Sequence, residues 1–297
     1  MIKRKVTRKT VKKSTVPKKR GRPSKKDIEA RLEEQRLALL ETNETPTERI
    51  ARIAERFTVM YRLTQGSING AVRSLIVSGA PGTGKSHTIV HLLDQAADRE
   101  QVRYEIIHGA LTAVNLYKLM YRYRGPNDII MLDDADTIYE DEDAMNILKG
   151  ALDSTEIRKI NWLAESATLK SEGIPTTFVY EGAMIFITNK DFQGIVDVGH
   201  RKMAPHFAAL MSRSIYLDLK LHTPADLLAW TVHMVTKNHI LVQRGLDYSQ
   251  ENDAVEWIQK HVDQVREISI RTLLKIADFI KTDPTNWEVF AKVTILR

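Results

Sequence analysis

The stretch Gly79–Ser86, GAPGTGKS, decides the fold of this 297-residue chain. It fits the pattern G-x-x-x-x-G-K-[ST] without a mismatch, between a short apolar run, SLIVS, and a helical pattern, SHTIVHLLDQAA. The glycines let successive backbone N–H groups wrap around phosphates, and the N-terminus of the following helix adds a favourable dipole. In such a loop Lys85 reaches the outer phosphates and the Ser86 hydroxyl binds Mg²⁺. The stretch therefore predicts a nucleotide site with contacts from Gly79, Ala80, Pro81, Gly82, Thr83, Gly84, Lys85, Ser86 and His87.

Two acidic residues, Asp133 and Asp134, end a later apolar run, IIMLDD. Asp133 is expected to hold Mg²⁺, directly or through water, together with Ser86. Asp134 is then placed to polarise the water that attacks the nucleotide. Taken alone, the pair also fits an ordinary strand that ends in an acidic turn. Downstream of a phosphate loop, it favours a Mg²⁺ site.

Short apolar runs alternate with helical patterns along the chain. The runs are SLIVSG (74–79), YEIIHG (104–109), DIIMLDD (128–134), AMIFITN (183–189) and SIYLDL (214–219). Strands that alternate with helices indicate a parallel sheet, and their near-continuous apolar character fits burial on both faces. We therefore expect an α/β fold with a doubly wound, parallel, five-stranded sheet.

Composition divides the chain into a tail, a linker, a sheet domain and a helical domain. The expected bounds are a disordered basic tail over 1–26, a helix and linker over 27–45, a phosphate-loop ATPase domain over 46–221 and an all-α lid domain over 222–297. In the linker, Asp27 is expected to cap a helix over about 28–41. The helices expected in the lid domain cover about 224–238, 250–265, 269–281 and 284–293.

Two capping patterns predict helix starts. Thr45–Glu48, TPTE, is a capping box with Pro at the first helical position, and its helix should run to about Thr64 before a loop over 65–71. Thr223–Asp226, TPAD, is a second such box. Downstream of Asp134, EDAMNILKGALDSTEIRKINWLAES is expected to be a helix and TLKSEGIPTTFVYEG a β-hairpin, in an insertion of the kind that often carries substrate contacts.

The phosphate loop and the Asp133–Asp134 pair resemble those of the AAA+ ATPases, and the resemblance extends over about residues 46–295. AMIFITN is similar to the sensor 1 strand of that family. Its terminal polar residue, Asn189, is then expected between the two acids, where it helps to orient the attacking water, with Thr188 as a weaker candidate.

Two arginines gain roles only through this resemblance. Leu210–Arg213, LMSR, resembles the SRC element of clamp loaders, which implies that Arg213 is an arginine finger for the γ-phosphate of a neighbouring subunit. Arg201 is a competing candidate for the finger. Ser269–Phe279 is similar to the lid helix of Holliday-junction motor ATPases, which places Arg271 at sensor 2.

The resemblance implies ATP and Mg²⁺ as cofactors and a homo-oligomer, in a ring or a filament, as the working state. It departs from the usual family pattern at Asp134, where most members have Glu. The Asp-Asp pair also occurs in replication initiators and helicase loaders of the family, so hydrolysis is still expected, at a rate that the sequence leaves open.

The first 26 residues carry 13 Lys and Arg and no acid, whereas the other 31 basic and 38 acidic residues give the rest of the chain a net charge of −7. The segment KKRGRPSKK resembles an AT-hook, in which an extended Arg-Gly-Arg lies in the narrow minor groove of A/T-rich DNA. Surrounding lysines would neutralise phosphates on duplex DNA. A nuclear localisation signal and a general polyanion arm, for RNA among others, are the alternatives. The residues expected to bind DNA are Lys18, Lys19, Arg20, Gly21, Arg22, Pro23, Lys25 and Lys26.

Composition excludes several classes of function. The chain has no cysteine, so disulfides and Cys-ligated metals are excluded, and its nine His are too scattered to predict a metal site. It has no apolar run long enough to span a membrane and no secretory signal. We expect a protein of the cytoplasm that associates with DNA, with the nucleus as a minor alternative.

The sequence thus favours a DNA-associated AAA+ ATPase that acts in replication or recombination as a helicase loader, initiator or DNA motor, from a phage or mobile element. One alternative is an architectural or regulatory DNA-binding protein that ATP switches with little turnover. Another is a protein-remodelling ATPase, although His108–Leu111, HGAL, lacks the aromatic residue of a threading loop. A kinase or GTPase is a third, although Asn189–Phe192 has its Asp one position too early for the guanine motif N-K-x-D.

Overall fold

A computed structural model describes residues 44–199, 203–221 and 223–297. The predicted tail over 1–26, the predicted helix over 28–41 and Arg201 lie outside the described residues.

Five parallel strands form the central sheet in the order β2-β3-β6-β1-β7. They are β1 (Ser74–Ser78), β2 (Arg103–His108), β3 (Asp128–Asp133), β6 (Ala183–Thr188) and β7 (Ile215–Asp218). Each lies within one residue of a predicted apolar run, so the predicted fold class is confirmed. Ser78 pairs with both Thr188 and Asp218, and His108 pairs with Asp133, so the carboxyl ends of the strands meet at one edge.

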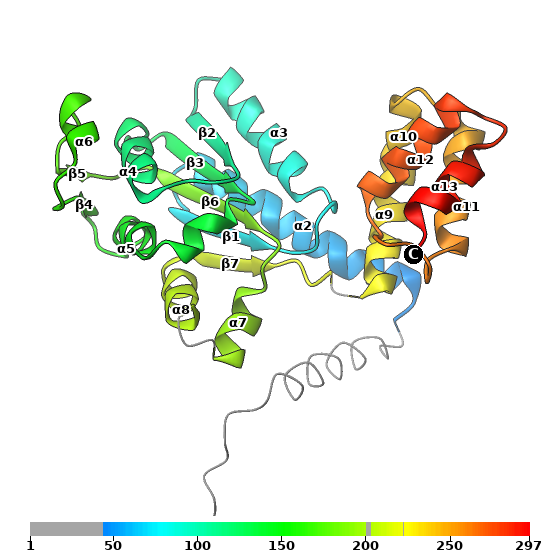
Figure 1. Cartoon of the computed structure of the whole chain (residues 1–297), viewed down its shortest axis with the longest axis horizontal. Helices are drawn as coiled ribbons and strands as arrows, with labels where there is room; N and C mark the ends of the chain where they lie inside the picture. Colours follow the sequence, from blue (N-terminus) through cyan, green and yellow to red (C-terminus); the bar gives the residue numbers. More distant parts are fainter. Residues whose placement is uncertain (1–43, 200–202, 222) are drawn as a thin grey trace, which may run out of the picture.

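Helices cover both faces of the sheet (Figure 1). One face packs against α2 (Pro46–Ile68) and α3 (Lys85–Asp98). The other packs against α4 (Ala113–Arg122), α5 (Glu142–Ala151), α7 (Phe192–Val198) and α8 (Ala204–Arg213). This doubly wound arrangement of helices on a parallel sheet is the fold that the sequence predicts.

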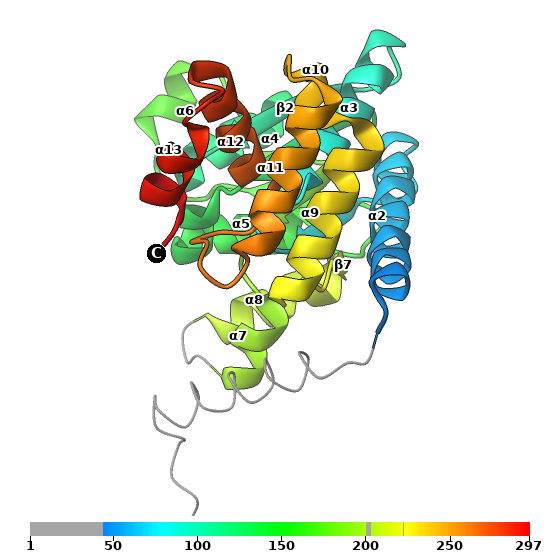
Figure 2. The ribbon, with the colours of Figure 1, turned by 90° about the vertical axis from the view of Figure 1, so that its right-hand side faces the viewer.

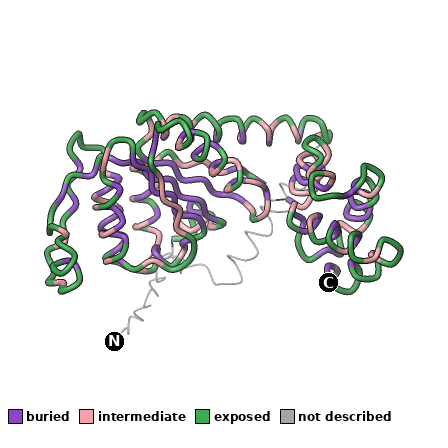
Figure 3. The backbone as a smooth tube through the Cα atoms, turned by 90° about the horizontal axis from the view of Figure 1, so that it is seen from above, coloured by how far each residue is buried: buried purple, intermediate pink, exposed green. Residues whose placement is uncertain are grey.

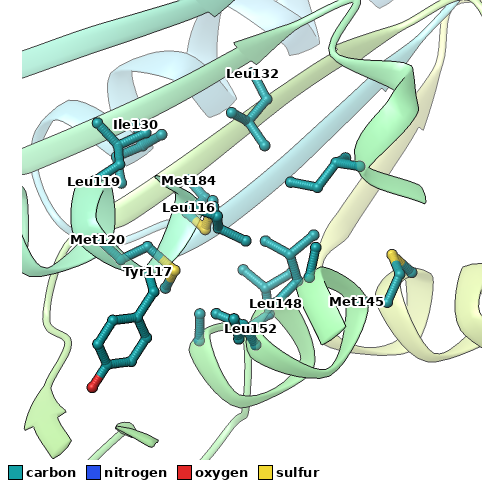
Figure 4. Close-up of a cluster of buried hydrophobic side chains, with 14 of the residues drawn as sticks. Leu116, Tyr117, Leu119, Met120, Ile130, Leu132, Met145, Leu148, Leu152 and Met184 are labelled. Atoms are coloured by element: carbon teal, nitrogen blue, oxygen red, sulfur yellow. The ribbon is translucent and has the colours of Figure 1, made fainter. Parts of the chain in front are cut away.

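Alternate side chains of the strands enter the two cores. Ile130 and Leu132 point into the cluster with Leu116, Tyr117 and the other residues of α4 and α5 shown in Figure 4, whereas Ile129 and Met131 belong to the cluster on the α2 and α3 face. All residues of β1, β3 and β6 are buried, as Figure 3 shows for the centre of the sheet. Burial on both faces explains why these strands read as continuous apolar runs.

The first described helix is longer than the sequence predicts. The Thr45 capping box is formed as expected, but α2 continues past Thr64 to Ile68. The predicted loop over 65–71 is therefore wrong in its first half. Gly66 lies inside the helix, and a Cβ at this position would lie 2.7 Å from Val72 Cγ2. The glycine permits a close approach of the returning chain and does not end the helix.

The insertion after β3 also differs from the prediction. After the short helix η1 (Asp136–Glu140), α5 ends at Ala151 instead of running on through the segment predicted as one helix. Arg158 explains the break, since its buried guanidinium donates to the carbonyls of Ala151 and Gly182 and so folds the chain back on itself.

The predicted β-hairpin is replaced by a two-stranded antiparallel sheet from more distant segments. It pairs β4 (Lys159–Asn161) with β5 (Thr177–Val179) around α6 (Ala167–Ser171). Tyr117 holds this sheet on α4 through ring contacts with Trp162 and Phe178. The insertion lies at the end of the molecule opposite the C-terminal helices (Figure 1).

The C-terminal residues form a helical region with its own apolar cluster. Its helices are α9 (Pro224–Asn238), α10 (Ile240–Gln243), α11 (Tyr248–Lys260), α12 (Ile270–Thr282) and α13 (Trp287–Ile295). The bounds of α9 match the prediction. The sequence misses α10, which is set off from α9 by the left-handed backbone of His239. Figure 2 shows this region facing the viewer, with α9 near α2.

A buried ion pair joins the helical region to α2. Thr223 caps α9 as predicted, but the Asp226 carboxylate does not complete a capping box. It instead accepts from Arg49 Nη1 and Arg52 Nη2, each at 2.7 Å. Phe57 of α2 also stacks on Trp230 of α9 with ring centroids 4.3 Å apart. These contacts fix the helical region against the sheet.

We expect Asp226→Ala to lower the free energy of unfolding by about 3 kcal/mol, because the substitution leaves Arg49 buried without its carboxylate. Chemical denaturation measures this. Glu288→Gln is the matched control, since the Glu288–Lys292 pair lies half exposed on α13 and should change stability by less than about 0.5 kcal/mol. Equal losses in the two variants would contradict the assignment.

The same pair sets a pH dependence of stability. Burial by itself would raise the pKa of Asp226, but hydrogen bonds from Arg49, Thr223 and Arg52 outweigh it and hold the pKa below its ordinary value. The stabilisation is therefore present above the unfolded-state pKa of about 3.9, and it is lost as pH falls through the lower folded-state pKa.

Candidate nucleotide site

The phosphate loop joins β1 to α3 at the carboxyl edge of the sheet. Gly82 and Gly84 have φ of 67° and 97°, in the left-handed region that favours glycine, and Gly84 is the N-cap of α3. A Cβ on Gly82 would also lie 2.6 Å from Ser269 Cβ. Both glycines are therefore needed for the path of the loop.

Lys85 lies buried beneath the loop. Its Nζ donates to the carbonyls of Gly79 (2.6 Å) and Ala80 (2.8 Å) and to Asn189 Oδ1 (3.1 Å). Burial lowers the pKa of Lys85 to about 8, against the opposing charges of Asp134 and Asp133. The ammonium is thus held at the centre of the site by carbonyl oxygens that a phosphate can replace.

The two predicted Mg²⁺ ligands lie side by side. Ser86 Oγ donates to Asp133 Oδ1 at 3.0 Å, and Asp133 is buried at the end of β3. A hydroxyl and a carboxylate are hard oxygen donors that suit Mg²⁺, which proteins usually hold through one or two side chains plus the phosphates of the substrate. The described residues contain no group of three or more His, Cys, Asp or Glu that could hold a metal by themselves. The residues present therefore fit Mg²⁺ bound together with a nucleotide.

Asp134 follows the strand in a left-handed conformation, with φ of 51°. Its N–H donates to the Ile187 carbonyl at 3.0 Å, and the residue lines the cavity beside the phosphate loop. Burial and the charge of Asp133 raise the pKa of Asp134 above its ordinary value.

Asn189 joins Asp134 to Lys85. Its Nδ2 donates to Asp134 Oδ1 at 3.1 Å while its Oδ1 accepts from Lys85. The sequence predicts Asn189 between the two acids, and the structure places it instead between an acid and the lysine. Asn189 follows β6, which lies between β3 and β1, so its side chain lies between the residues that follow those two strands.

The helical region packs against the phosphate loop and covers one side of the site. The N–H of Ile270, at the start of α12, donates to the Gly82 carbonyl at 3.1 Å, and Trp230 Nε1 donates to the Thr83 carbonyl at 3.0 Å. Arg271 follows Ile270 and lines the cavity between the loop and the helices. The predicted sensor 2 residue therefore lies at the site.

This cavity has a volume of about 680 Å³. Besides the phosphate loop, His87, Asp134 and Asn189, residues that the sequence did not single out line it: Thr88, Ile187, Met234, Asn238, Ile240, Gln243, Ile270 and Leu274. Most of them come from α9, α10 and α12. No motif marks the residues of α9 and α10, since they meet the loop only through the packing of the helical region.

Arg213 does not line this cavity. It ends α8, two residues before β7, and therefore lies at the amino edge of the sheet, opposite the phosphate loop. Its Nη1 donates to the Ala209 carbonyl at 3.1 Å, and its Nε lies 3.9 Å from Asp153 Oδ2. Arg213 is thus placed away from the site of its own subunit. The predicted DNA-binding residues from Lys18 to Lys26 lie outside the described residues.

A scan against protein families finds no match to the chain. Among solved structures, the chain is similar to "Replication initiator DnaA bound to AMPPCP and single-stranded DNA", with a TM-score of 0.45, 12% identity and coverage of 76% of this chain and 61% of that one. It is also similar to "Crystal structure of DNA replication initiation factor", with a TM-score of 0.43, 14% identity and coverage of 77% and 61%. The chain thus spans about three fifths of the length of these two solved chains.

A sequence relative is much closer in identity. Over 251 residues the chain is 38% identical to the "Uncharacterized 36.7 kDa protein in nrdC-mobD intergenic region" of Enterobacteria phage T4, with coverage of 84% of this chain and 77% of the phage protein. The protein belongs to the family of this phage T4 protein.

Proposed function

We propose that the protein is a Mg²⁺-dependent ATPase that associates with DNA and works as a homo-oligomer. One observation carries the enzymatic part of the proposal: the hydrogen-bonded chain from Lys85 through Asn189 to Asp134, beside the Ser86–Asp133 pair, lines a cavity large enough for a nucleotide. This arrangement places a cation, two Mg²⁺ ligands and a general base within one site.

In the proposed reaction, backbone N–H groups of the loop hold the phosphates, and Lys85 exchanges the carbonyls of Gly79 and Ala80 for phosphate oxygens. Asp134 orients a water molecule and accepts its proton as the water oxygen bonds to the γ-phosphorus. The bond from that phosphorus to the bridging oxygen breaks, which gives ADP and inorganic phosphate. Mg²⁺ at Ser86 and Asp133 would neutralise charge on the phosphates. Asn189 holds the Asp134 carboxylate, and Arg271 faces the same charge from the lid.

The position of Arg213 supports an assembled active state. A cation at the edge of the sheet opposite the phosphate loop is available to the site of a neighbouring subunit, where it would stabilise the charge of the transferring phosphoryl group. Each site is then slow until the oligomer completes it. This links hydrolysis to the state of assembly.

The DNA-associated part of the proposal rests on the charge of residues 1–26, which contrasts with a net charge of −7 for the rest of the chain. Duplex DNA is the polyanion that the Arg20–Pro23 segment fits best, through the minor groove. We place the activity in DNA replication or recombination, as a helicase loader, initiator or motor with a replication protein as its partner. The phage T4 relative favours the cytoplasm of an infected bacterium over a nucleus. No helix in the described residues has the length and apolar character to cross a membrane.

A second candidate function is an ATP-dependent switch with little turnover. The observation that favours it is Asp134 itself, which is one methylene shorter than the usual Glu and is held by Asn189. Turnover separates the two functions, because a switch binds ATP and barely hydrolyses it.

Removal of residues 1–26 is expected to weaken duplex DNA binding at least about a hundredfold at physiological salt and to flatten the dependence of affinity on salt concentration. Fluorescence anisotropy with A/T-rich and G/C-rich duplexes measures both. A variant with Arg20 and Arg22 replaced by Lys is the matched control, since it keeps the charge. It should retain most of the affinity and lose the A/T preference. Equal DNA affinity with and without the tail would contradict the assignment.

A further inference from the structure

The turn after Asp134 contains an acid that neither the phosphate loop nor the metal ligands explain. Asp136 begins η1, two residues beyond Asp134, and its side chain is about one-third exposed. It does not line the cavity, so it does not face the nucleotide directly. It is nevertheless bonded across the sheet edge to the residues on both sides of Asn189.

The first of these bonds goes to Thr188, which is fully buried at the end of β6. Thr188 Oγ1 donates to Asp136 Oδ1 at 3.0 Å and accepts from the N–H of Lys190 at 3.0 Å. The second goes to Lys190, whose Nζ lies 3.5 Å from Asp136 Oδ2. One carboxylate thus holds the residue before Asn189 and the residue after it.

The β1 side of the sheet holds the same two residues, Thr188 and Lys190. The Gly79 N–H donates to the Thr188 carbonyl at 3.3 Å, and Ser78 Oγ donates to the Lys190 carbonyl at 2.8 Å. The backbone on both sides of Asn189 is therefore fixed, and the Asn189 side chain is free to join Lys85 to Asp134. Of the two neighbouring strands, β1 supplies backbone and hydroxyl contacts, and only the β3 side supplies a charge.

We propose that Asp136 is a positioning residue for hydrolysis: by holding Thr188 and Lys190 it sets the Asn189 amide, and through it the Asp134 carboxylate, in the reactive arrangement. This inference rests on the proposed ATPase function. Its physical basis is that a small displacement of a catalytic group lowers a rate strongly while leaving the binding contacts of the substrate intact. Asp136 touches no nucleotide-binding residue, so its loss should act on turnover and spare binding.

The test compares kcat and the Kd for ATP in Asp136→Ala, Asp136→Asn and Thr188→Val. We expect Asp136→Ala to lower kcat about tenfold to a hundredfold while the Kd for ATP changes less than about threefold. Asp136→Asn keeps an oxygen that accepts the Thr188 hydroxyl and should lose less. Thr188→Val removes that hydroxyl at nearly constant volume. The double variant with Asp136→Ala should lose less than the two single losses combined, since both single variants remove the Thr188–Asp136 hydrogen bond.

Glu140→Gln, an exposed acid in the same short helix, is the matched control and should keep the wild-type kcat. Equal kcat in Asp136→Ala and the wild type, or strictly additive losses in the double variant, would overturn the positioning role while leaving the ATPase function intact. A parallel loss of ATP affinity and kcat would also overturn it, because a structural defect affects both. A wild-type chain without turnover would overturn both proposals. If Asp136→Ala does not fold, Asp136→Asn and Thr188→Val carry the same comparison.

Discussion

Replacing Lys85 with alanine is expected to weaken ATP binding about a hundredfold, by about 2–3 kcal/mol. The reason is the burial of Lys85 under the phosphate loop, where its ammonium contacts the Gly79 and Ala80 carbonyl oxygens that the phosphates are to replace. Titration calorimetry or a fluorescent ATP analogue measures the change. Lys292→Ala, on the exposed side of α13, is the control and should bind ATP like the wild type. ATP bound equally well by the Lys85→Ala variant would remove the phosphate loop from the site.

Lys85 also predicts how ATP binding depends on pH. Burial lowers the pKa of Lys85 to about 8 in the free protein, and a bound triphosphate favours the charged form and must raise this pKa. ATP affinity should therefore be highest where Lys85 is already protonated, below pH 8, and fall as pH rises through 8. Binding near pH 8 should be accompanied by proton uptake, which calorimetry in buffers of different ionisation enthalpy detects.

Replacing Asp134 with asparagine is expected to lower kcat for ATP hydrolysis about a thousandfold, because the amide cannot accept a proton from water. ATP binding should stay within about threefold of the wild type, since Asn189 can still donate to the new amide oxygen and Lys85 is unchanged. Phosphate release and equilibrium ATP binding measure the two quantities. Asp143→Asn, at an exposed position of α5, is the control.

The raised pKa of Asp134 also predicts how the rate of hydrolysis depends on pH. As the base, Asp134 must be ionised, so the wild-type rate should fall as pH drops, beginning at a higher pH than an ordinary aspartate would give. The acid limb should be absent from the residual activity of Asp134→Asn. A variant that keeps the wild-type rate and acid limb would exclude Asp134 as the base.

The sequence predicts the centre of the sheet well because β1, β3 and β6 are buried on both faces and carry mostly apolar residues. The phosphate loop is equally clear, since Gly82 and Gly84 are required by backbone geometry and Lys85 and Ser86 by phosphate chemistry. The sequence therefore predicts the fold and the phosphate-binding part of the site together.

Contacts between distant segments explain what the sequence misses. The predicted loop over 65–71 overlooks the contact of Gly66 with Val72, and the predicted long helix overlooks the carbonyl partners of Arg158. Asp226 is predicted to complete a capping box, but its carboxylate instead accepts hydrogen bonds from arginines more than 170 positions earlier. Local patterns carry no information about such partners.

In the site, too, local sequence predicts which residues take part, but tertiary packing decides where they lie. Asn189 is predicted from its strand, but its position between Lys85 and Asp134 follows from strand order. The cavity residues on α9 and α10, such as Asn238 and Gln243, have no motif at all. They meet the phosphate loop only because α9 and α12 are bonded to it.

The most direct test of the central claim is the steady-state rate of Mg²⁺-dependent ATP hydrolysis by the full chain. The Asp134→Asn variant gives the background rate, and ATP binding is measured in parallel. The proposed function predicts multiple turnovers that rise with protein concentration, as sites shared between subunits require, and that exceed the Asp134→Asn rate by about a thousandfold. A wild-type chain that binds ATP but hydrolyses it no faster than Asp134→Asn at any concentration would contradict the ATPase and leave the ATP-dependent switch.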